Sequence, residues 1–141
     1  MRVARGRTVI LVRSAPKRGV LVVEDFADTR ELLAELLMEE GYHSIMASNG
    51  VEALKRLEEI QADVVVTDLV MPDLGGAELV RRMASDPRMK AIPIILLTGS
   101  GREKAIEALG DRAGQVLAIL TKPVQIDELL TSVEAALDGS R

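Results

Sequence analysis

Acidic residues, a threonine and a lysine stand at the ends of short apolar segments along this chain of 141 residues. Glu24 and Asp25 follow one segment, Asp68 follows a second, and two further segments end at Thr98 and Lys122. If these segments are parallel strands of one sheet, their carboxyl ends lie along one edge, where open α/β sheets bind ligands. We therefore expect these side chains to share one site.

Three carboxylates in one crevice repel one another, which raises their pKa values unless a cation binds between them. Oxygen ligands without a nearby histidine or cysteine favour a hard ion, so we expect Mg²⁺ or Mn²⁺ beside Glu24, Asp25 and Asp68. Lys122 supplies a second positive charge across the site. Between the metal and the ammonium group, Asp68 is placed to attack a phosphorus atom and to carry a phosphoryl group as an aspartyl phosphate.

The elements that must position these residues alternate between short β-branched segments and longer stretches of helical period, as in βα units around a parallel sheet. The apolar segments predict five strands, at 20–23, 43–47, 62–67, 93–97 and 116–120. Amphipathic stretches predict five helices; Asp28 and Asp127 are expected to cap the first and last, and Asn49 or Ser48 the second. The acidic strand ends meet only if strands one and three are neighbours. The expected fold is therefore an α/β, flavodoxin-like doubly wound sheet of order 2-1-3-4-5, with helices on both faces.

Composition and charge indicate one domain with a distinct leader. A chain of this length with 48% hydrophobic residues can form one globular core, which we place at residues 19–141. Residues 1–18 contain six basic residues and no acid, whereas the rest contains twelve basic and twenty-two acidic residues. We expect 1–18 to be a flexible basic extension, with an ordered edge strand at 8–12 or a functional basic tail as alternatives.

Residue types that the chain lacks exclude several classes of protein. Without cysteine there is no disulfide framework and no thiolate metal site, which fits a cytoplasmic protein. The longest apolar run near the N-terminus, 9–12, is too short for a signal peptide or a membrane helix. Phe26 and Tyr42 are the only aromatic residues, so base-stacking platforms cannot be built. We expect no membrane and no direct nucleic-acid partner.

Several motifs together resemble the receiver domain of bacterial two-component response regulators over about residues 19–138. The run VLVVED at 20–25 resembles that family's first strand and acidic pair, and VVVTDLVMP at 64–72 resembles its phospho-acceptor strand and Met-Pro turn. Gly76 matches the loop glycine, and PIILLT at 93–98 resembles the strand that bears the switch hydroxyl. Lys122-Pro123 resembles the family's Lys-Pro pair, whose peptide bond is usually cis. The combination is highly specific, and the chain is identified as a stand-alone, single-domain receiver.

The resemblance implies a signalling module, with self-catalysed phosphotransfer and autodephosphorylation as its only chemistry. Asp68 would accept a phosphoryl group from a histidine kinase or a histidine phosphotransfer protein. Mg²⁺ would be held by Asp25, Asp68 and the backbone carbonyl of Val70, with Glu24 acting through water.

The resemblance also implies a conformational switch next to the acceptor. Lys122 would pair with one phosphoryl oxygen, and Thr98, beside Gly99, would donate its hydroxyl to another. The surface of the fourth helix, fifth strand and fifth helix would then change and contact a downstream protein. The chain would be a monomer or a phosphorylation-dependent dimer.

The chain departs from the family pattern in three respects. Ile119 stands where relatives often carry the aromatic residue that moves with the switch hydroxyl, and Gly99 replaces the usual alanine, which adds backbone freedom. Val70 and Ser100 lie two residues beyond the acceptor and the switch threonine, where they flank the route of the hydrolytic water. We expect the apolar Val70 to lengthen the lifetime of the phosphoryl group.

Three alternatives stay open at this point. A flavin or nucleotide binder on the same sheet would need a phosphate loop after the first strand, and Phe26-Ala27-Asp28 offers none. A pseudo-receiver would bind partners without being phosphorylated. The chain could also be the receiver part of a longer multidomain regulator.

Overall fold

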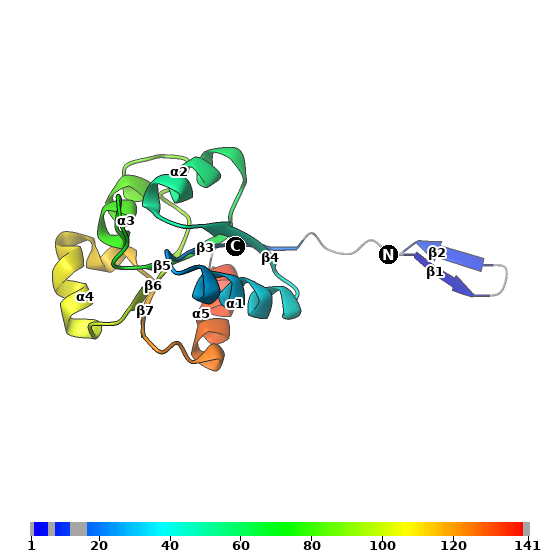
Figure 1. The fold of residues 1–141 in the computed structure, drawn as a ribbon. Helices are drawn as coiled ribbons and strands as arrows, with labels where there is room; N and C mark the ends of the chain where they lie inside the picture. Colours follow the sequence, from blue (N-terminus) through cyan, green and yellow to red (C-terminus); the bar gives the residue numbers. More distant parts are fainter. Residues whose placement is uncertain (1, 6–7, 12–16, 140–141) are drawn as a thin grey trace.

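The computed structural model describes residues 2–5, 8–11 and 17–139, with side-chain surroundings for 17–139. Five strands alternate with helices after an N-terminal pair of strands (Figure 1). The strands are β1 (Arg2–Arg5), β2 (Thr8–Leu11), β3 (Gly19–Val23), β4 (His43–Ala47), β5 (Val64–Asp68), β6 (Ile94–Thr98) and β7 (Ala118–Thr121). The helices are α1 (Ala27–Glu39), α2 (Gly50–Glu59), α3 (Gly76–Ala84), α4 (Arg102–Leu109), the 3₁₀ helix η1 (Gly110–Gln115) and α5 (Ile126–Gly139).

The central sheet has the order β4-β3-β5-β6-β7, and its neighbouring strands are parallel. In the order of the chain this is 2-1-3-4-5, so the predicted flavodoxin-like topology is confirmed. β3 and β5 are neighbours, and Val23 lies opposite Thr67 in their register. The residues that follow these two strands therefore emerge at the same edge.

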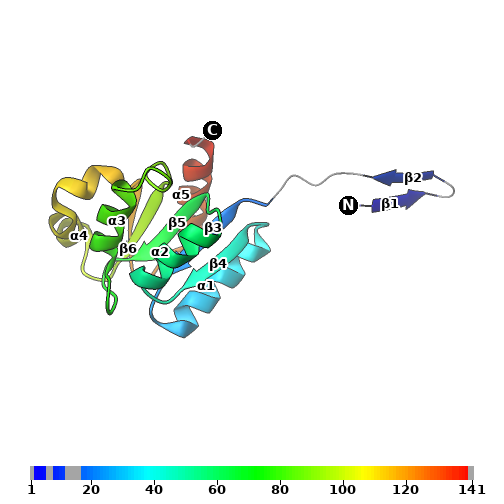
Figure 2. The same cartoon turned by 90° about the horizontal axis from the view of Figure 1, so that it is seen from above.

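Helices cover both faces of the sheet (Figure 2). Successive side chains of a strand point to opposite faces, so β3 contributes Val20 and Val22 to a core with α1 and α5, and Leu21 and Val23 to a core with α2, α3 and α4. β3, β5 and β6 are buried along their whole length. Burial on both faces explains why these strands read as continuous apolar runs rather than as alternating ones.

Two of the three predicted helix caps differ from the structure. The residue that precedes α1 is Phe26, which makes no side-chain cap, and Asp28 lies inside the first turn. α5 begins at Ile126, so Asp127 is also a first-turn residue. Both aspartates lie where a carboxylate interacts favourably with the helix dipole, which explains the misleading signal. Asn49 caps α2 as predicted, because its side chain accepts a hydrogen bond of 2.9 Å from the Glu52 N–H.

The N-terminal strands form their own antiparallel sheet, in which β2 pairs with β1 rather than with an edge of the central sheet. Residues 1, 6–7 and 12–16 lie outside the described residues, so a flexible extension over 1–18 stays a prediction. Across the part of the chain that the structure describes, no helix combines the length and apolar character needed to cross a bilayer.

Candidate functional site

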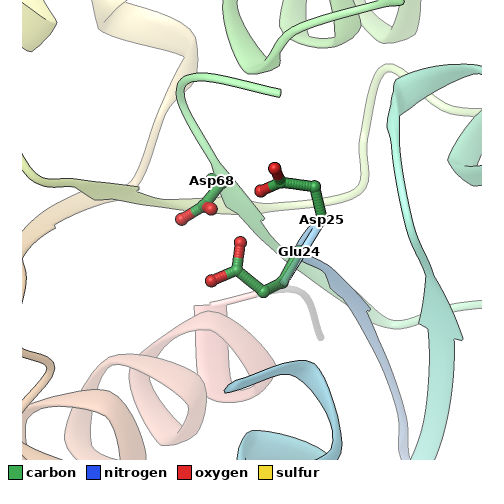
Figure 3. Close-up of side chains that lie close together, drawn as sticks. All are labelled: Glu24, Asp25 and Asp68. Atoms are coloured by element: carbon green, nitrogen blue, oxygen red, sulfur yellow. The ribbon is translucent and has the colours of Figure 1, made fainter. Parts of the chain in front are cut away.

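Three carboxylates converge where β3 and β5 end. Asp68 is the last residue of β5, and Glu24 and Asp25 directly follow β3. Figure 3 shows the three side chains turned toward a shared space, and one carboxylate oxygen of each lies within 4.8 Å of the others. The parallel register of β3 and β5 therefore brings together residues 43 positions apart in the sequence, as the spacing predicted.

The amino group of Lys122 neutralises part of this negative charge. Lys122 Nζ donates a hydrogen bond of 3.1 Å to Glu24 Oε1 and lies 2.7 Å from Asp68 Oδ1 in an ion pair. Glu24 and Asp68 are only 1% and 3% exposed, whereas Asp25 is exposed. One ammonium group thus serves two buried carboxylates, and the site carries excess negative charge.

The two buried acids have pKa values that are shifted in opposite directions. Burial, followed by contact with the Glu24 carboxyl group, raises the pKa of Asp68 to about 7, although Lys122 works against the shift. For Glu24, burial alone would raise the pKa, but contacts with Asp68 and Lys122 outweigh it and the pKa is lowered. Burial would also lower the pKa of Lys122, but its two carboxylate partners raise it. Near neutral pH, Lys122 and Glu24 are therefore charged, and Asp68 is the group that titrates.

The backbone around Glu24 is held from both sides. Its N–H donates to the Ala47 carbonyl at 3.1 Å, which extends the pairing of β3 with β4 by one residue. Its carbonyl accepts a 2.8 Å hydrogen bond from Arg30 Nη1, which reaches back from α1. Arg30 is a supporting residue that sequence reasoning missed, because one helical arginine among many carries no signal until the helix is docked.

The loop after Asp68 turns back tightly over the end of β5. The Gly76 N–H donates to the Leu69 carbonyl at 2.8 Å, and a Cβ atom at position 76 would lie 2.2 Å from the Asp68 carbonyl oxygen. Asp73 in the same loop has a positive φ of 64°. Only glycine allows this approach at position 76, so the loop glycine fixes the backbone next to Asp68.

A hollow of about 290 Å³ opens beside Asp68 and contains several of the predicted site residues. Asp68, Leu69, Val70, Leu97, Gly99, Ser100 and Lys122 line it. The side chain of Val70 is 78% exposed at its rim. Thr98 is buried, and its hydroxyl lies 3.1 Å from Ser100 Oγ. A small group that enters this hollow would therefore lie next to Asp68.

Two further predicted positions lie on or just after β7. Ile119 is half-buried and packs on the core formed with α2, α3 and α4, so no aromatic ring stands there to move with Thr98. The peptide bond between Lys122 and Pro123 is cis. The Lys122 N–H donates to the Thr98 carbonyl at 2.8 Å, which ties the lysine to the end of β6.

The donor set fits a hard divalent cation. All three side chains offer carboxylate oxygens, the ligands that Mg²⁺ and Mn²⁺ prefer. Glu24 Oε2 and Asp68 Oδ1 are buried without a hydrogen-bond partner among the described residues, although the ammonium of Lys122 pairs with the latter. Buried oxygens of this kind are costly unless a cation or a hydrogen-bond donor satisfies them. The site therefore has the chemistry of a receiver metal site.

The fold and the acidic site are those of a response regulator receiver domain, and residues 20–134 match that family. The chain belongs to this family of two-component signalling modules, whose members are typically not enzymes and pair with histidine kinases.

Individual relatives show how widely this domain is used. Protein PilH of Pseudomonas aeruginosa is 32% identical over 85% of this chain and 98% of its own length. The CAI-1 autoinducer sensor kinase/phosphatase CqsS of Vibrio cholerae is 38% identical over 92% of this chain, which spans only 19% of that protein. Among solved structures, the signal receiver domain of a histidine kinase from Syntrophus aciditrophicus superposes with a TM-score of 0.79 at 30% identity, covering 86% of this chain and 91% of that one.

Proposed function

We propose that this chain is a phospho-acceptor: Asp68 takes a phosphoryl group from the phosphohistidine of a histidine kinase or a histidine phosphotransfer protein. The observation that carries the proposal is the pairing of Asp68 with Lys122 beside two further carboxylates, at a hollow open to solvent. An ion pair that served only to stabilise the fold would need neither three carboxylates nor a hollow that is open beside it.

In the proposed reaction, a carboxylate oxygen of Asp68 forms a bond to phosphorus. The phosphorus–nitrogen bond of the donor breaks, and the imidazole nitrogen keeps its electron pair. Lys122 Nζ, which lies 2.7 Å from Asp68 Oδ1, is close enough to pair with a phosphoryl oxygen once Asp68 is phosphorylated. Thr98 would donate its hydroxyl to another phosphoryl oxygen.

A divalent cation would complete the charge balance of the site. Asp25, Asp68 and the Val70 carbonyl would hold it, with Glu24 acting through water. When bound, it would neutralise charge on the phosphoryl oxygens and on the acceptor. The excess of carboxylates over ammonium groups supports this role, since Lys122 alone leaves the site negative.

The signal would leave through protein contact on the face formed by α4, β7 and α5. α4 begins four residues after Thr98, and Lys122 directly follows β7 and lies four residues before α5, so a movement of either residue would occur close to this face. Ile106 on α4 is 40% exposed and Leu117, just before β7, is 52% exposed. Exposed apolar side chains of this kind are suited to a protein partner. We place the phosphorylatable unit at residues 19–141, so deletion of 1–18 should leave phosphorylation unchanged.

The test is the intact mass of the protein after incubation with acetyl phosphate and Mg²⁺. The wild type should gain one phosphoryl group, whereas Asp68→Asn and a sample treated with EDTA should gain none. Asp111→Asn, an exposed aspartate on η1, is the matched control and should behave as the wild type. A folded wild type that gains no mass would contradict the proposal and favour a pseudo-receiver, which binds partners without phosphorylation.

A further inference from the structure

The hydroxyl group of Thr98 already has partners in this structure. Ser100 Oγ lies 3.1 Å from Thr98 Oγ1, and the Ser100 N–H donates to the same oxygen at 3.1 Å. A hydroxyl has one proton to donate and two lone pairs to accept with. These two contacts therefore fix the Thr98 side chain in one orientation.

Ser100 contacts this hydroxyl and also lines the hollow beside Asp68. It is exposed and lines the hollow next to Asp68 and Lys122, whereas Thr98 is buried. The intervening Gly99 has no neighbouring atom within 4 Å of where a Cβ would stand. The segment can thus move without a steric obstacle on that side.

The backbone on the two sides of Ser100 differs in how firmly it is held. The Thr98 carbonyl accepts the 2.8 Å hydrogen bond from the Lys122 N–H, which anchors it to the sheet. On the other side, Gly101 has a φ of 91°, and α4 begins there without a side-chain cap. The contacts between Thr98 and Ser100 therefore connect the end of β6, which is anchored to the sheet, with the segment that leads into α4, which has fewer contacts to hold it.

We propose that Ser100 is a positioning residue that holds the Thr98 hydroxyl in its unphosphorylated orientation and so opposes the switch. This inference rests on the proposed function, because it concerns how Thr98 becomes available to a phosphoryl group. Thr98 does not line the hollow beside Asp68, so its hydroxyl must leave its present position to reach a phosphoryl oxygen there. That movement breaks the contact with Ser100 Oγ, and the segment that leads into α4 is released with it. Ser100 thereby shifts the equilibrium between two states, one with Thr98 held by Ser100 and one with Thr98 turned toward the phosphoryl group, which we call the switched state.

The size of the effect follows from the contact that is lost. A hydrogen bond between two neutral hydroxyls, here the buried Thr98 and the exposed Ser100, has a small net stabilising effect. Removing the Ser100 hydroxyl should therefore favour the switched state by about two- to fivefold. A direct role of Ser100 as a donor to the phosphoryl group would have the opposite sign.

The test is the binding of beryllium trifluoride in the presence of Mg²⁺, since this anion mimics a phosphoryl group on a carboxylate. Ser100→Ala should lower the Kd by about two- to fivefold. Ser85→Ala is the matched control, because the Ser85 hydroxyl is exposed and donates only to the Arg81 carbonyl; its Kd should equal that of the wild type. In a Thr98→Val background, Ser100→Ala should have no effect on the Kd, because the hydroxyl that Ser100 holds is then missing.

A second measurement tests the contact in the free protein. Hydrogen exchange at the Ser100 amide should be faster in Thr98→Val than in the wild type, because the acceptor at 3.1 Å is removed. Weaker or unchanged binding in Ser100→Ala, or an equal effect in both backgrounds, would overturn the proposed role of Ser100 alone. A folded wild type that binds no beryllium trifluoride would instead overturn the proposed function, and the role of Ser100 with it.

Discussion

The raised pKa of Asp68 predicts that the metal-free protein loses stability as the pH rises. In the folded protein the pKa of Asp68 is about 7, whereas the usual pKa of an aspartate is 3.8. Between these values the folded state binds more protons than the unfolded state, so the free energy of unfolding falls with increasing pH. Replacing Asp68 with asparagine, which cannot ionise, should remove this dependence.

The magnitude follows from the two pKa values. A difference of about three pH units corresponds to at most about 4 kcal/mol, of which about 2 kcal/mol is lost between pH 5.5 and pH 8. Glu24 does not contribute in this range, because its pKa is lowered and it is ionised throughout.

The assay is urea unfolding followed by far-ultraviolet circular dichroism, since the chain has no tryptophan. Wild type and Asp68→Asn are measured in EDTA at pH 5.5 and pH 8. The wild type should lose about 2 kcal/mol more than the variant, and Mg²⁺ should restore much of the wild-type stability at pH 8. Equal pH dependence in the two proteins would show that Asp68 is already ionised at pH 5.5, and the electrostatic argument for the site would be wrong.

Three further substitutions test the surroundings of the site. Gly76→Ala should destabilise the fold by about 2 kcal/mol or more, because its Cβ would meet the Asp68 carbonyl oxygen at 2.2 Å; urea unfolding beside Gly114→Ala, where no atom lies within 4 Å, checks this. Asn49→Ala should cost about 1 kcal/mol in the same measurement, since it removes the cap of α2. Val70→Asn should speed the loss of the phosphoryl group, because an amide can orient water where the exposed valine cannot; a time course of intact mass that shows equal or slower loss would refute this.

The residues that meet at the site could largely be predicted from the sequence. Asp68 and Lys122 stand at the ends of strongly apolar segments, and a parallel sheet places all such ends at one edge. Apolar periodicity was sufficient for this, because the buried strands of the central sheet tolerate few polar residues. The order 2-1-3-4-5 followed from the requirement that Asp25 and Asp68 meet.

Local signals predicted the ends of elements less well. The aspartates near the starts of α1 and α5 were expected to cap these helices, but both lie inside the first turn. A carboxylate is favourable at either position, so residue type alone does not distinguish them. The predicted bounds of β7 also differ from those in the structure. The apolar run predicted a strand at 116–120, but only Ala118–Thr121 pairs with β6, because an apolar residue can be buried without belonging to a strand.

Hydrophobic periodicity and the common direction of parallel strands were sufficient to predict the sheet, the edge at which the acidic residues meet and the residue types gathered there. Only the tertiary structure decided which groups contact one another at that edge. The sharing of Lys122 between Glu24 and Asp68, the reach of Arg30 to the Glu24 carbonyl and the contact of Thr98 with Ser100 each depend on side-chain orientation. Lys122 is placed by packing between elements far apart in the chain, whereas the contacts of Arg30 and Ser100 depend on the path of the backbone over six and two residues. Neither kind of contact has a periodic signal in the sequence.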